Sequence, residues 1–199
     1  MTLAAALLFS ALCVNLVTQA SPVDTPAHWP NGTVILVWID PRTAPSGADA
    51  LVERAMTTWT QAAGGHFTLK KTAARNAALV RVGFVGGNAN YGETRPRIDR
   101  STGTIDEADV HINSDVAGDA LDRHIILYLT ALHELGHALG LPHSDDFSTI
   151  MYSFRRPGDG ERYFRAYRQR LRSVDDVGSA RATGLAPGDL AALRALYGS

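Results

Sequence analysis

The sequence reads HELGHALGLPH from residue 133 to residue 143. His133 and His137 are four residues apart, so on a helix they lie one above the other on the same face, where two imidazoles can share one metal ion. Gly140 suits the left-handed conformation in which helices end, and Pro142 cannot continue a helix. The chain is therefore expected to turn sharply after the helix and to return His143 toward the same ion.

Three histidine ligands leave the fourth position of a zinc ion open, which is the layout of a catalytic site; a structural site fills all four positions with protein ligands. Glu134 follows the first histidine, and its carboxylate is not needed for coordination. Zinc lowers the pKa of a bound water from about 15.7 to about 7, so Glu134 is predicted to be the general base and then to protonate the leaving amine. One such histidine alone would be read as a core residue, but chance does not explain the whole set.

The elements around the motif predict an α+β fold. β-Branched and apolar runs predict strands over Thr33–Asp40, His66–Lys71, Leu79–Phe84 and Ile105–Asn113. An extended segment over Tyr91–Asp99 would belong at a sheet edge, because its proline cannot donate to a ladder. Strands precede helices along the chain, as in α+β proteins.

Two helices are predicted from capping residues and apolar periodicity. Ser46 and Asp49 resemble a capping box at the start of a helix that ends before Gly64. Asp119 or Asp122 is predicted to cap the second helix, which carries the histidines and runs to residue 140.

Length and charge indicate one globular domain. The chain has 199 residues and a formal net charge of −1, so it has no basic footprint for nucleic acid or for an acidic membrane surface.

We expect a domain over residues 31–199, a proline-rich connector over 21–30 and an apolar signal peptide over 1–20. The signal lacks a positively charged start, so an uncleaved membrane anchor stays open as the alternative. Cys13, the single cysteine, lies inside this segment.

Taken together, these residues make the sequence similar to the metzincins, and within them to the matrixins. Residues 149–152, Thr-Ile-Met-Tyr, resemble the Met-turn of that group, in which Met151 would support the metal site from below. Ser144, directly after the third histidine, resembles the matrixin branch, and Asp189–Gly198 is similar to the helix that closes matrixin catalytic domains. The chain resembles the compact bacterial members.

The resemblance implies a zincin-like fold: a twisted, mostly parallel five-stranded sheet with an antiparallel edge strand, two long helices and a C-terminal helix. It also implies a secreted, monomeric zinc-dependent endopeptidase that hydrolyses internal peptide bonds of protein or peptide substrates. The site would consist of Glu134 as the catalytic residue and one zinc ion on His133, His137 and His143.

Several positions depart from the matrixin pattern. His111 stands where a structural-zinc ligand would be but has no partner motif, so a second zinc is not expected. Asn113 replaces a calcium-binding carboxylate, so calcium is not expected either. Ser153 and Arg155 stand where matrixins usually have the Pro and Tyr that wall the pocket beside the scissile bond.

An arginine-rich insertion is expected at about residues 155–182. Its apolar residues recur at helical spacing and predict an extra amphipathic helix: Tyr163, Phe164, Tyr167, Leu171 and Val174. Its basic side is either a solvated face or a contact with an acidic substrate or another protein.

Two other classes of function share this sequence pattern. A zinc hydrolase acting on a non-protein amide would use the same residues, and only its product would distinguish it. A pseudo-enzyme that binds peptides without cutting them would more often have lost Glu134, which is present.

Overall fold

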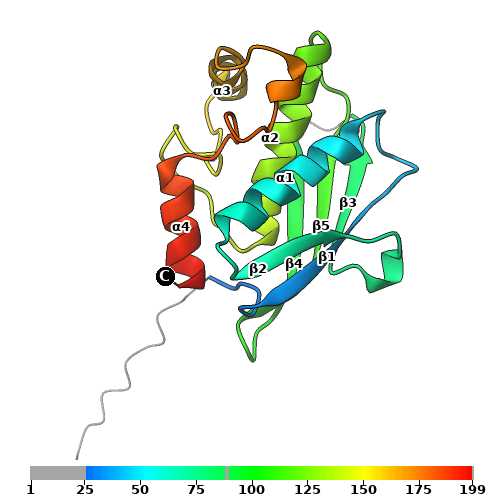
Figure 1. Cartoon of the computed structure of the whole chain (residues 1–199), viewed down its shortest axis with the longest axis vertical. Coiled ribbons are helices and arrows are strands. Elements are labelled where there is room, and N and C mark those ends of the chain that lie inside the picture. The colour runs from blue at the N-terminus through cyan, green and yellow to red at the C-terminus, as the bar shows by residue number, and fades with distance from the viewer. Residues whose placement is uncertain (1–25, 88–89, 199) are drawn as a thin grey trace, which may run out of the picture.

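The computed structural model describes residues 26–87 and 90–198 of the chain (Figure 1). The signal segment predicted over residues 1–20, with Cys13, lies outside the described residues, and so does the first half of the connector predicted over 21–30. No helix in the described part has both the length and the apolar character that crossing a membrane requires.

Five strands form one sheet in the order β2-β1-β3-β5-β4 (Figure 1). The strands are β1 (Thr33–Ile39), β2 (Phe67–Lys71), β3 (Val80–Val85), β4 (Gly92–Asp99) and β5 (Thr104–Asn113). Neighbouring strands are parallel, except that β4 runs antiparallel to β5. The expected sheet, mostly parallel with one antiparallel edge strand, is thus confirmed.

β4 occupies the edge of the sheet, as its proline predicted. Pro96 lies opposite Ala108 of β5, and the register shifts between Arg97 and Ile98. A proline removes a backbone donor, and an irregularity ends regular pairing, so both features are tolerated at an edge. Within the described residues, no strand pairs with the other side of β4.

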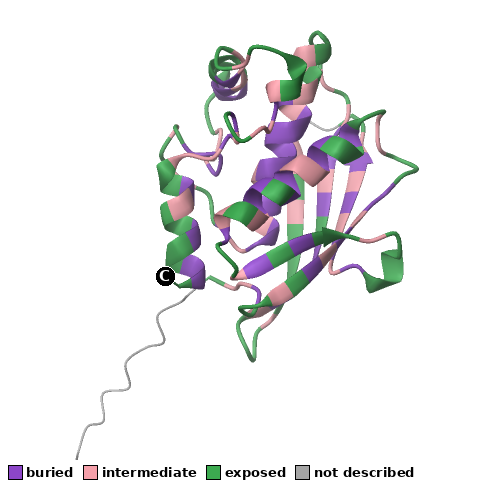
Figure 2. Cartoon of the chain, viewed as in Figure 1, coloured by how far each residue is buried: buried purple, intermediate pink, exposed green. Residues whose placement is uncertain are grey.

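Two long helices cover one face of the sheet. α1 (Ala48–Ala62) and α2 (Ala120–Ala138) pack against each other, α1 against β2, and α2 against β4 and β5 (Figure 1). The strand β3 buries alternate residues, as a sheet with one covered face requires. Buried residues gather between the helices and the sheet (Figure 2).

The first helix begins differently from the prediction. Its N-cap is Gly47, which is left-handed with φ 78°, and no side chain caps the helix. The carboxylate of Asp49 instead lies 3.5 Å from the ammonium group of Lys71 on β2. The prediction of a Ser46–Asp49 capping box is therefore wrong, because the carboxylate of Asp49 pairs with Lys71 on β2 instead of capping the helix. The second helix has Asp119 as its N-cap, whose side chain accepts the N–H of Asp122.

The chain after the Met-turn contains the extra helix, α3 (Asp159–Arg168), and the chain closes with α4 (Pro187–Tyr197). α3 is shorter than the apolar periodicity predicts, and Val174 is exposed rather than on a buried face. The carboxylate of Asp176 accepts the N–H groups of Arg172 and Ser173, which satisfies backbone donors outside any α-helix. These side-chain hydrogen bonds take the place of the backbone hydrogen bonds that a longer α3 would form.

The packed part of the fold begins upstream of residue 31. Trp29 is 2% exposed, and its indole N–H donates to the carbonyl of Ala138 at 2.8 Å. Tyr197 of α4 donates to the next carbonyl, that of Leu139, at 2.7 Å. The C-terminus of α2 is therefore held from both sides by segments that are distant in sequence.

Candidate functional site

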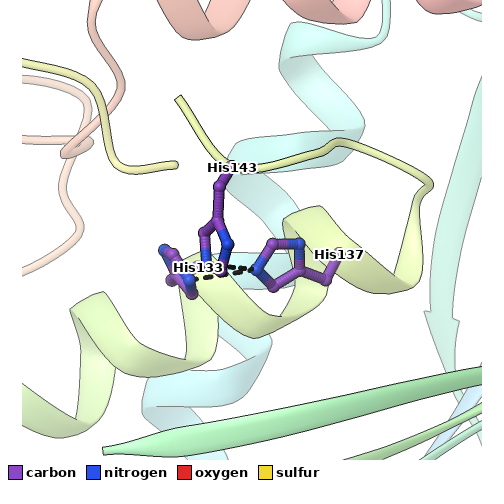
Figure 3. A group of neighbouring side chains, drawn as sticks. All are labelled: His133, His137 and His143. Carbon is purple, nitrogen blue, oxygen red and sulfur yellow. Dashed lines mark hydrogen bonds between the residues drawn. The ribbon is translucent and has the colours of Figure 1, made fainter. Parts of the chain in front are cut away.

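Three histidine side chains converge at the C-terminal end of α2 (Figure 3). His133 and His137 are one turn apart on the helix, and His143 approaches from the segment that follows it. The Nε2 atom of His137 lies 3.1 Å from that of His133 and 3.2 Å from that of His143. Among the described residues, this is the one group of His, Cys, Asp and Glu side chains found with the spacing of a metal site.

Gly140 makes the turn that returns the chain to the site. Its φ of 95° is left-handed, and a Cβ there would lie 2.1 Å from the carbonyl oxygen of Ala27. The N–H of Leu141 donates to the carbonyl of Gly136, and that of Gly140 to the carbonyl of His137, which is the Schellman pattern of a helix end. The predicted left-handed turn at Gly140 is confirmed, although the helix itself ends at Ala138 rather than at residue 140.

Backbone carbonyls orient two of the rings. Nδ1 of His133 lies 2.6 Å from the carbonyl of Ile150, and Nδ1 of His137 lies 2.8 Å from that of Leu141. A carbonyl can only accept, so Nδ1 carries the proton in both rings and Nε2 presents a lone pair. Lone pairs 3.1 Å apart repel each other unless a cation lies between them. The donor set therefore fits a metal ion.

The protonation of the histidines agrees with this fit. Burial, together with the neighbouring His137, lowers the pKa of His133 to about 3. Burial also lowers the pKa values of His137 and His143, although His143 is the most exposed of the three. Neutral imidazole is the form that binds metals, so all three rings are available as ligands at neutral pH.

Glu134 lies beside the histidines with its carboxylate buried against β4. The residue is 5% exposed, and its Oε2 accepts a hydrogen bond from the hydroxyl of Thr94 at 2.7 Å. Burial raises the pKa of Glu134 to about 7, while the Thr94 hydrogen bond acts in the opposite direction. No sequence pattern pointed to the contact between Thr94 and Glu134, because these residues lie on different elements, β4 and α2.

The Met-turn lies beneath the histidines. Met151 is 2% exposed, and a Cβ at Gly136 of α2 would lie 2.5 Å from its sulfur, so this glycine permits the close packing. The buried carboxylate of Asp189 accepts the N–H groups of Ile150 at 3.0 Å and Met151 at 3.3 Å. From the sequence alone, Asp189 could not be distinguished from an ordinary residue in the first turn of α4.

A cavity of approximately 570 Å³ adjoins the histidines. It is bounded by the start of β4, by α2 and by the segment that leads into α3. Ser153 lines the cavity as expected, whereas Arg155 does not; its guanidinium pairs with Asp145 at 3.3 Å. Phe154, between them, also lines the wall and has a φ of 45°, which is unusual for a residue with a side chain.

The two positions linked to other metals lie on β5. His111 stands opposite Glu93 of β4. Asn113 donates from its side-chain amide to the carbonyl of Asn90 and accepts the N–H of Asp115. That neither residue binds zinc or calcium stays a prediction.

Four features together define the metzincin class of metalloendopeptidases. They are this α+β sheet, a helix that carries two histidines and a glutamate beside the antiparallel edge strand, a third histidine, and a methionine turn. The model of the matrixin family matches residues 33–165, which is well over half of the chain. The chain belongs to the matrixin family, whose members are zinc-dependent endopeptidases.

One relative gives the extent of this similarity. Interstitial collagenase of Oryctolagus cuniculus is 30% identical over 121 residues, which amount to 56% of this chain and 25% of that protein. The match thus covers about a quarter of the length of this relative.

Proposed function

We propose that the protein is a secreted zinc-dependent endopeptidase, in which His133, His137 and His143 hold one zinc ion and Glu134 moves the proton. The observation that carries the proposal is the convergence of three histidine ring nitrogens within 4.8 Å of one another. The orientation of two rings by backbone carbonyls and the membership in the matrixin family support it.

Each residue has a distinct part in the hydrolysis. A zinc ion on the three histidines supplies Lewis acidity, which favours deprotonation of water and polarises a peptide carbonyl. Glu134 accepts the proton of the attacking water and gives it to the nitrogen of the leaving fragment. The close packing of Met151 against Gly136 ties the Met-turn to the helix that carries His133 and His137.

The open edge of β4 suits an extended peptide. The N–H of Asn113 donates to the carbonyl of Tyr91, so pairing alternates along β4 and the main-chain groups of Gly92 and Thr94 point away from β5. A substrate strand that lies along this edge gains main-chain hydrogen bonds whatever its side chains. This geometry favours peptides over small non-protein amides as substrates.

The cavity favours an apolar side chain next to the scissile bond. Leu129, Ile150 and Phe164 line it together with the histidines. Apolar surface in a pocket of this kind stabilises an apolar group through burial. We therefore propose that cleavage occurs beside apolar residues.

The proposal is tested by incubating the zinc-loaded protein with an unfolded protein and with a mixed peptide library, and by reading the new termini with mass spectrometry. We expect about one zinc per chain and cuts at internal peptide bonds. A chelator should stop the cleavage and added zinc should restore it. Binding of peptides without cleavage, or hydrolysis of non-peptide amides only, would contradict the proposal.

Secretion is a separate part of the proposal, and it rests on the apolar stretch over residues 1–20. Sequencing the N-terminus of exported protein tests it. A new terminus close after Ala20 is expected, whereas protein that keeps Met1 and stays with the membrane fraction would indicate an anchor.

A further inference from the structure

The carboxylate of Glu134 packs against two residues of the edge strand, Gly92 and Thr94, which we call the β4 seat. Gly92 and Thr94 are two residues apart on β4, so they share the face of the strand that meets α2. A Cβ at Gly92 would lie 2.7 Å from both Cγ and Oε1 of Glu134 and 2.9 Å from Cδ. The hydroxyl of Thr94 lies 2.7 Å from Oε2. One residue leaves room for the carboxylate, and the other holds it.

We infer that Thr94, with Gly92 beside it, is a positioning residue that fixes the orientation of the Glu134 carboxylate for proton transfer. The inference rests on the proposed role of Glu134 as general base. Thr94 would act only through the Glu134 carboxylate, to which its hydroxyl donates.

The hydrogen bond matters because the carboxylate has few other partners. Within residues 26–87 and 90–198, the one hydrogen bond found to the Glu134 carboxylate comes from Thr94. Glu134 is 5% exposed and lines the cavity, so its contact with water is limited to few molecules. With Oε2 held, Oε1 is the oxygen left to meet a reacting proton. A carboxylate free to rotate would spend less time in that orientation.

A purely structural role for Thr94 makes a different prediction. Its hydroxyl also lies 2.9 Å from the backbone carbonyl of Glu134, so it could serve only to tie β4 to α2. Loss of such a tie lowers the stability of the fold and leaves the rate of the chemical step unchanged. Loss of an oriented base lowers kcat and has little effect on KM.

The test compares Thr94→Val, which keeps the shape but removes the donor, with Thr94→Ser, which keeps the hydroxyl. For Thr94→Val we expect kcat to fall by about ten- to a hundredfold, the usual effect of removing a hydrogen-bonded supporting partner at such a site. KM and zinc content should change little. Thr94→Ser should restore most of kcat. Thr57→Val is the matched control, because within the described residues its hydroxyl donates to the backbone carbonyl of Glu53 alone, on the exposed side of α1.

Crystal structures of the parent and of both Thr94 variants give a readout that does not depend on activity. The carboxylate should have one orientation in the parent and in Thr94→Ser, and should leave the β4 seat or divide between orientations in Thr94→Val. Gly92→Ala adds an independent arm, since its Cβ should displace the same carboxylate and also lower kcat.

Parental kcat in Thr94→Val with an unmoved carboxylate would overturn the inference, and so would a loss of stability with no change in kcat. If the parent cleaves no peptide at all, the proposed function fails, and the inference fails with it. If the parent cleaves and Thr94→Val cleaves equally well, only the inference fails.

Discussion

The ring of Tyr91, the residue before β4, meets the ring of Phe164 on α3 edge to face, with the ring centroids 5.0 Å apart. Tyr91 also packs closely on Gly160, where a Cβ would lie 2.8 Å from its ring. Both rings line the cavity beside the histidines. The extra helix is therefore joined to the edge strand at one end of the cleft, and it limits the space available to substrate there.

We predict that Phe164→Ala will enlarge this end of the cleft and shift side-chain preference toward larger residues. The ratio of kcat/KM for a peptide with tryptophan beside the scissile bond to one with alanine should rise by about tenfold, the low end of what a change in pocket size produces. Peptide libraries read by mass spectrometry provide the measurement. Phe147→Ala is the control, because this ring packs on Tyr163 outside the cavity. An unchanged preference would place the substrate elsewhere.

Glu134→Ala should keep zinc and lose activity. A positioned general base contributes about two to four orders of magnitude to rate, so kcat/KM should fall by about that amount. Zinc content, measured by elemental analysis, should match the parent because the carboxylate is not among the converging ligand atoms. Glu53→Ala, on α1, should behave like the parent. Full activity in Glu134→Ala would rule out the proposed mechanism.

His143→Ala should weaken metal retention while the fold stays intact. This histidine is exposed and lies after the helix, so its loss opens no cavity in the core. Zinc remaining after dialysis should drop, and the circular dichroism of the protein should not change. His111→Ala on β5 serves as the control, with unchanged zinc content. The ligand assignment would be wrong if the His143 variant kept its full zinc.

Stability at low pH should depend on the ion pair between α3 and the N-terminus of α2. The guanidinium of Arg168 lies 2.9 Å from the carboxylate of Asp119 and holds the pKa of that carboxyl at about 2. In the unfolded chain the pKa of Asp is about 3.9. The unfolded state therefore binds more protons between these values, so the pair stabilises the fold above about pH 4 and this contribution disappears as the pH falls toward 2.

Urea unfolding of the metal-free protein at pH 6 and pH 3 measures this effect without interference from zinc release. Arg168→Gln should lower the midpoint at pH 6 and reduce the difference between the two pH values. Arg165→Gln, on the exposed side of the same helix, is the control. An equal pH dependence in parent and Arg168→Gln would show that Asp119 does not couple to folding through this pair.

The convergence of the three candidate ligands was predictable because their geometry is local. His133 and His137 need only a helix, and His143 needs only the turn that Gly140 permits with its φ of 95°. The edge strand followed from Pro96 in the same way, since a residue without an N–H has few places in a sheet. In these cases one residue type at one position restricts the backbone strongly.

The rest depends on contacts between distant segments, which a single sequence does not encode in any short pattern. The Thr94 hydrogen bond to Glu134 and the contact of Tyr91 with Phe164 each join different elements. The helix predicted from the apolar spacing is longer than α3, because this spacing does not show that the carboxylate of Asp176 accepts a backbone N–H group after the helix.

Asp189 has a consequence for the order in which the site is completed during synthesis. Its carboxylate accepts the N–H groups of Ile150 and Met151, and it follows all three histidines in the chain. The ribosome therefore releases the candidate ligands first and the group that fastens the turn beneath them later. The hydrogen bonds that hold Ile150 and Met151 to α4 can form only after α4 has been synthesised, so a nascent chain contains the three candidate ligands before the turn beside them is fixed.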